Sequence, residues 1–142
     1  MKKIFNSSNA TALSGAQIKA VISNKQIIKV TGITFNQSGS TYGTVTFNAD
    51  GAKIEGNVFI NADYLRLQNV KINGNVTVND VASNNVTFDN VTVKQSVVIE
   101  DGYLSFGVST NDVITNTSND YNIVFSYVDG RTTYSLTKKI NI

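Results

Sequence analysis

The side chains in this chain that could do acid–base chemistry are its carboxylates, because the sequence contains no His and no Cys. Hydrolysis of a glycosidic bond needs two carboxyl groups that flank the bond, one as the acid and one as the nucleophile or base. Four carboxylates of the central part of the chain each stand alone or at an expected strand corner: Glu55, Asp63, Asp80 and Asp89. No catalytic pair can be assigned at this spacing, so the sequence predicts a protein that is not an enzyme.

The same composition predicts no metal site and no cofactor. The His and Cys ligands of most transition-metal sites are absent, and the acidic residues are scattered. The 12 Lys and Arg residues are scattered as well, without a basic run interleaved with aromatic residues. Nucleic acid is therefore not an expected partner.

Aromatic, amide and hydroxyl side chains offer a second kind of chemistry. The chain has six Tyr residues and no Trp, and its polarity comes mainly from Asn, Thr, Ser and Gly. Aromatic rings can stack on sugar rings, while amides and hydroxyls hydrogen-bond sugar hydroxyls. A glycan is therefore kept as an alternative partner.

The element that must position these side chains is a pattern that returns three times between Val45 and Ile99. Each copy contains three triplets in which two apolar residues flank one other residue. Equivalent residues lie 18 or 21 positions apart, as in Ile54 and Ile72 or Leu65 and Val86. A period near twenty with this content is typical of a coiled β-solenoid, in which each copy is one turn and the inward residues of every triplet are buried.

Gly and Asn recur where the expected turns change direction. Gly56-Asn57 and Gly74-Asn75 occupy the same expected corner in successive turns, and glycine there would supply a positive φ. Asn69 and Asn90 stack at another expected corner. We expect these two side chains to form an asparagine ladder.

The two ends of the chain follow other patterns. Residues 1–12 are polar and expected to be extended or mobile. Residues 13–24 place Ile18, Val21 and Ile22 on one face of a predicted helix that would cover the first turn. Residues 37–41 predict a projecting polar loop. At the other end, two alternating segments flank Asp129-Gly130, which predicts a hairpin.

The segment from Leu65 to Val78, LRLQNVKINGNVTV, returns from Val86 to Ile99 as VTFDNVTVKQSVVI. It resembles the right-handed parallel β-helix repeats of bacterial surface-layer-associated and other extracellular proteins, and is similar to β-helices of phage spikes and adhesins. The resemblance covers roughly residues 12–106 and implies a fold more than a function. Enzymes of this kind use clustered Asp with Ca²⁺ and an Arg or Lys base. The arginines here are Arg66 and Arg131, and no matching Asp cluster is present, which argues against a lyase.

Together these observations predict an all-β fold: a short right-handed parallel β-helix, or β-solenoid, of about 4–5 turns, with an N-terminal capping helix and a C-terminal β-hairpin. The predicted organisation is a polar arm at 1–12, the capping helix and solenoid at 13–115, and the hairpin at 116–142. No segment is apolar for long enough to span a bilayer, so membrane insertion is not expected. No secretory signal follows Met1-Lys2-Lys3 either.

The predicted function is that of a non-catalytic subunit of an extracellular structure, such as a surface layer, filament or fibre on a cell or virion. It would self-associate through strand edges or an apolar solenoid wall. The candidate interface residues are Phe59, Val98, Thr77, Tyr42, Tyr64 and Tyr103. Two alternatives remain open: a carbohydrate- or receptor-binding module of a phage fibre, spike or adhesin, and a bactofilin-like intracellular polymer.

Overall fold

The computed structural model describes residues 1–79, 86–99, 104–106, 113–114, 120–129 and 132–141, with side-chain surroundings for residues 1–79 and 86–99. These residues form one 3₁₀ turn and thirteen strands. In chain order they are η1 (Ser7–Asn9), β1 (Gln17–Ser23), β2 (Gln26–Phe35), β3 (Val45–Asn48), β4 (Lys53–Ile54), β5 (Asn57–Ile60), β6 (Leu65–Ile72), β7 (Val76–Val78), β8 (Val86–Val93), β9 (Val97–Ile99), β10 (Leu104–Phe106), β11 (Val113–Ile114), β12 (Asp120–Asp129) and β13 (Thr132–Asn141).

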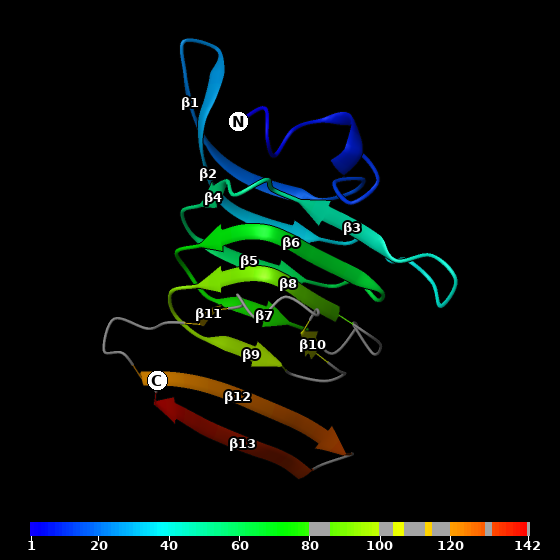
Figure 1. Cartoon of the computed structure of the whole chain (residues 1–142), viewed down its shortest axis with the longest axis vertical. Helices are drawn as coiled ribbons and strands as arrows, with labels where there is room; N and C mark the ends of the chain where they lie inside the picture. The colour runs from blue at the N-terminus through cyan, green and yellow to red at the C-terminus, as the bar shows by residue number, and fades with distance from the viewer. Residues whose placement is uncertain (80–85, 100–103, 107–112, 115–119, 130–131, 142) are drawn as a thin grey trace.

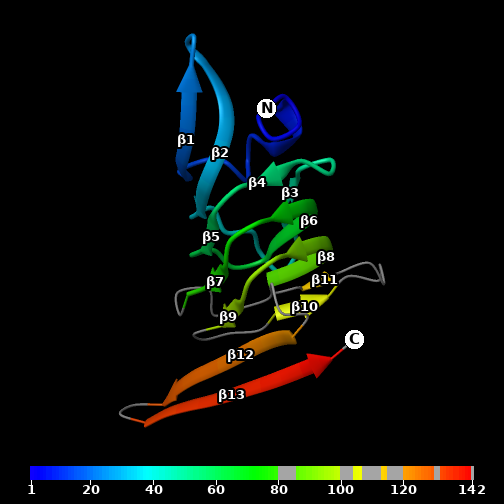
Figure 2. The ribbon, with the colours of Figure 1, turned by 90° about the vertical axis from the view of Figure 1, so that its left-hand side faces the viewer.

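The strands form two sheets. The larger sheet has seven strands in the order β1-β2-β5-β7-β9-β12-β13. The smaller sheet runs β10-β8-β6-β3, with β11 paired to β8 and β4 paired to β6. Pairing is antiparallel between β1 and β2 and between β12 and β13, and parallel between the other strands. The two antiparallel pairs therefore stand at opposite ends of the molecule (Figures 1 and 2).

The sequence repeats set the register of the parallel strands. Ile54 is the partner of Ile72, and Leu65 is the partner of Val86, as their spacing predicts. Alternate residues of these strands point between the two sheets and are buried, as the alternating burial of β5, β7 and β9 shows. Phe35 of the larger sheet meets Phe47 of the smaller one with ring centroids 5.0 Å apart, so aromatic packing joins the sheets.

The predicted right-handed parallel β-helix is wrong as a description of this fold. The sheets mix parallel and antiparallel pairs and do not close into a solenoid. One physical reason lies in β6, where the two triplets expected on separate walls form a single strand of eight residues. Asn69 adopts a φ of 49° inside that strand without ending it. The chain therefore turns between two sheets instead of around three walls.

The predicted N-terminal capping helix is also wrong, and the described residues contain no α-helix. Residues 17–23 form β1, which pairs with β2 through a two-residue turn. Asn24 and Lys25 have φ values of 49° and 61°, as a type I′ turn requires. Ile18, Val21 and Ile22 are β-branched, which favours a strand over a helix.

The N-terminal segment is folded onto the body and is not the extended arm that its polarity predicts. Ile4 and Ala12 are fully buried. The buried amide of Asn9 donates to the backbone oxygen of Asn48 at 2.9 Å and accepts from the backbone nitrogen of Asn48 at 2.9 Å. The Asn9 side chain thereby makes the two hydrogen bonds that a neighbouring strand would make to Asn48, at the outer edge of β3.

The corner residues are explained by two different effects. Asn69 and Asn90 form the predicted ladder, with Asn90 Nδ2 donating to Asn69 Oδ1 at 2.7 Å. Gly56 and Gly74, in contrast, do not have the expected positive φ. They are needed because neighbouring turns approach closely: an added Cβ would overlap the Thr31 carbonyl oxygen at Gly56 and the Asn57 side chain at Gly74.

The C-terminal segment contains the antiparallel strands that its alternation predicts. β12 and β13 pair from Asp120 with Asn141 to Asp129 with Thr132. β12 also pairs in parallel with β9, so this hairpin extends the larger sheet. Gly130 of the predicted turn lies outside the described residues.

Candidate functional site

Three of the predicted interface residues lie in one row across the outer face of the larger sheet. Phe59 is the partner of Thr77, and Thr77 is the partner of Val98. Thr34 of β2 extends the row on the other side of Phe59. Phe59 is 37% exposed, whereas Thr77 and Val98 are half-buried. The strand register places these three residues side by side, and their role in an interface stays a prediction.

The predicted tyrosines do not join this row. Tyr42 is fully exposed in the loop before β3, and Tyr64 is half-buried just before β6 with a φ of 50°. Thr41 Oγ1 donates to Tyr64 Oη at 3.0 Å, and Gly39 N donates to the Asp63 carbonyl at 2.8 Å. The predicted polar loop is therefore tied to the turn that leads into the smaller sheet.

Tyr103, the sixth predicted interface residue, lies outside the described residues.

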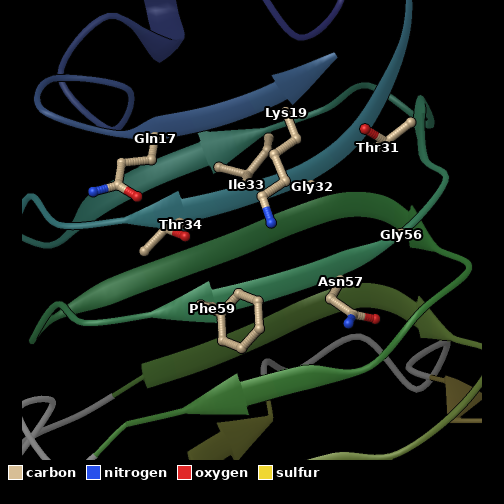
Figure 3. Close-up of a pocket in the computed structure, with 9 residues that line it drawn as sticks. All are labelled: Gln17, Lys19, Thr31, Gly32, Ile33, Thr34, Gly56, Asn57 and Phe59. Carbon is tan, nitrogen blue, oxygen red and sulfur yellow. The ribbon is translucent and has the colours of Figure 1, made fainter. Parts of the chain in front are cut away.

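A pocket opens beside Phe59 on the outer face of the larger sheet, where β1, β2 and β5 lie next to one another (Figure 3). Its volume is about 340 Å³, at the small end of the range for small-molecule sites. The lining residues come from three strands and the turn before β5: Gln17, Lys19, Thr31, Gly32, Ile33, Thr34, Gly56, Asn57 and Phe59.

The strand register places the Lys19 side chain above Gly32 in this pocket. Lys19 is the partner of Gly32, and Gly32 is the partner of Asn57. A Cβ built on Gly32 would lie 3.6 Å from both Cβ and Cδ of Lys19, so the lysine stem covers the glycine. Figure 3 shows the side chain reaching across β2 toward β5.

Sequence reasoning missed this pocket because it placed residues 13–24 in a helix. With that assignment, Gln17 and Lys19 had no fixed relation to Phe59. The signal that could have found it is Asn24-Lys25, whose type I′ geometry sets the β1–β2 register.

The β1–β2 hairpin carries four exposed apolar side chains. It projects beyond the stack of parallel strands (Figures 1 and 2). The exposed fractions are 37% for Ile18, 43% for Val21, 67% for Ile22 and 56% for Ile28. β1 is also the last strand of the sheet, so these side chains flank a strand edge.

Two of the carboxylates, Glu55 and Asp89, are held by polar side chains of neighbouring strands and turns. Lys53 Nζ lies 2.7 Å from Glu55 Oε1, and this hydrogen bond is the main reason that the pKa of Glu55 is lowered from its usual 4.5. Asn73 Nδ2 donates to the other Glu55 oxygen at 2.6 Å, and Gln68 Nε2 donates to Asp89 at 2.8 Å. Asp80 lies outside the described residues.

No group of three or more potential metal ligands occurs in the part of the chain that the structure describes. Within the same part, no helix is long and apolar enough to cross a membrane. Comparisons with protein-family models, with curated proteins and with solved structures gave no match for this chain. The resemblance to surface-protein repeats therefore stays a hypothesis.

Proposed function

We propose that this chain is a non-catalytic subunit of an extracellular assembly and that it joins copies of itself by pairing the edge strand β1. The observation that carries the proposal is that β1 is an exposed edge strand whose sequence is complementary to itself.

The edge of β1 differs from the corresponding edge of the smaller sheet. Asn9 covers the edge of β3 with two hydrogen bonds to Asn48. No other segment donates a hydrogen bond to the outer side of β1 among the described residues, and β1 ends its sheet. Lys19 is its one charged residue, and the chain has no Pro to block pairing. An uncovered strand edge is a template for another strand.

The sequence of β1 reads almost the same in both directions: Gln-Ile-Lys-Ala-Val-Ile-Ser. If two copies pair antiparallel around Ala20, Ile18 of each lies opposite Ile22 of the other, and the polar ends lie opposite each other. Lys19 lies opposite Val21 and not opposite a second lysine. Such a pairing is symmetric and closed by a two-fold axis. Cross-strand pairs of β-branched residues would stabilise it.

The geometry favours this edge over the predicted apolar wall. In the row through Phe59, both Thr77 and Val98 are half-buried, so Phe59 is the one exposed apolar side chain among these three. Ile22 of β1 is 67% exposed and Ile18 is 37% exposed, and both lie beside unpaired backbone. At the far end of the same sheet lies β13, so each copy has two edges, and pairing at both would propagate a filament or layer.

The test is to place like charges at the expected contact and then to replace one charge of each pair by its opposite. We expect the double variant Ile18→Lys with Ile22→Lys to raise the dissociation constant of the self-association about tenfold, because two lysine pairs would then lie opposite each other. Ile18→Glu with Ile22→Lys should restore association, since each glutamate would face a lysine. Sedimentation equilibrium measures the constants, and negative-stain images show the form of the assembly.

The matched control is Ile28→Lys, an exposed isoleucine of the same hairpin on β2. It should leave the dissociation constant unchanged. A wild-type chain that stays monomeric at every concentration would overturn the proposed function. Association that survives the two lysines, or that the glutamate–lysine pair does not restore, would show that β1 is not the contact.

A further inference from the structure

The pocket beside Phe59 combines groups that together suit one class of ligand. We infer that it binds a saccharide residue that carries a carboxylate, such as a hexuronic acid. The inference is independent of the proposed self-association, because the pocket lies on the β2 side of β1, away from the strand edge.

One wall of the pocket is an exposed aromatic ring. Phe59 is 37% exposed and lies on β5 next to the pocket, as Figure 3 shows. Gly32 and Gly56 also line the pocket, with the Lys19 stem over Gly32 and the Thr31 carbonyl against Gly56. The C–H face of a pyranose ring can pack against an aromatic face, so Phe59 offers a platform for a sugar ring.

The remaining lining groups supply hydrogen-bond donors and acceptors in several directions. Gln17 and Asn57 contribute amides, and Thr31 and Thr34 contribute hydroxyls. Asn57 Oδ1 already accepts from the Asn75 backbone nitrogen at 2.9 Å, which leaves its NH₂ group as a donor. A set of amides and hydroxyls around an aromatic platform matches the hydroxyls of a sugar better than it matches a purely apolar ligand.

The charge around the pocket favours an acidic sugar over a neutral one. Lys19 forms no ion pair with a carboxylate of the described residues. Lys29 is the partner of Val21, so it lies on the same strand pair. The nearby carboxylate of Glu55 is already paired with Lys53 at 2.7 Å. The pocket therefore presents an unneutralised ammonium group to a ligand, and a carboxylate would meet it with a charge-assisted hydrogen bond.

The experiment compares two ligands that differ in one group. Methyl β-D-glucuronide and methyl β-D-glucoside are titrated into the isotopically labelled full chain, and amide chemical shifts report binding. We expect the acid to bind about tenfold more tightly than the neutral sugar, the difference that one hydrogen bond to a charged group typically makes. The shifts should centre on the amides of Lys19, Gly32 and Phe59.

Three variants separate the contributions. Lys19→Gln should bring the affinity for the acid down to that for the neutral sugar, and Phe59→Ala should weaken both ligands. Lys25→Gln removes the same charge at the exposed hairpin turn and should leave both affinities unchanged. Equal affinity of the wild type for the two sugars, absence of shifts at the pocket, or the same loss in Lys25→Gln as in Lys19→Gln would each overturn the inference.

Discussion

At the scale of single residues, asparagine side chains link one strand layer to the next. The links are of two kinds. Amide-to-amide ladders join Asn48 to Asn69 and Asn90, and Asn36 to Asn61 and Asn79, while the side chains of Asn57 and Asn75 accept from the backbone of the next layer. Asn69 and Asn90 were predictable because they recur at the repeat spacing. Asn9 was not, because its partner lies 39 residues away and outside any repeat.

Replacement of Asn9 by Ala tests how strongly the N-terminal segment is held. The buried amide also donates to the Ile4 carbonyl at 2.9 Å, so its removal leaves several backbone groups without a partner. We expect the free energy of unfolding to fall by about 3 kcal/mol, measured by urea denaturation. Ser8→Ala changes an exposed residue of the same turn and should cost less than about 0.5 kcal/mol. Equal effects of the two changes would contradict this account.

Glu55 gives the chain a pH dependence of known sign. Its pKa is lowered in the folded state, first by the hydrogen bond from Lys53. A lowered pKa contributes stability above the unfolded value of 4.5, and this contribution is lost as the pH falls through the folded value. We expect Glu55→Gln to melt below wild type at neutral pH and together with it well below pH 4.5, as followed by circular dichroism. A difference in melting temperature that persists at low pH would have another origin.

At the scale of elements, the sequence predicted the register of the parallel strands correctly, but it predicted a helix where the structure has strand β1. The period of apolar triplets places Ile54 beside Ile72 and also puts Phe59, Thr77 and Val98 in one row. Residues 17–23 lie outside the period, and their apolar spacing fits a helix as well as a strand. Asn-Lys is a weaker hairpin signal than Asn-Gly, so the turn, and with it the pocket, was missed.

The turn itself can be strengthened. Lys25 has a φ of 61°, a region that costs a residue with a Cβ about 1 kcal/mol or more and costs glycine little. We therefore expect Lys25→Gly to raise the free energy of unfolding by about 1 kcal/mol, measured by urea denaturation. Lys25→Ala removes the same charge but keeps the Cβ and should give no gain. Destabilisation by glycine would instead indicate a helix in this segment.

At the scale of the whole molecule, the two sheets differ in how their edges are covered at the end that carries the N-terminus. The smaller sheet is covered by residues of the N-terminal segment, whereas the larger sheet continues into the projecting β1–β2 hairpin (Figure 1). Because of this asymmetry, the edge of β1 is open to a partner. The outer face of the same hairpin lines the pocket beside Phe59. Self-association and ligand binding would therefore use the same end of the molecule without competing for the same atoms.

The β1–β2 hairpin also has a consequence for biosynthesis. Its strand pairing joins residues 17–34, which are made before the strands of the repeats. Hairpins close within about 1–10 μs, whereas ribosomes add about 5–20 residues per second. The edge of β1 can thus form transiently while the rest of the chain is still being made, and the later pairing of β2 with β5 fixes it in place. Neighbouring nascent chains on one messenger RNA would present identical edges to each other, and assembly could begin during translation.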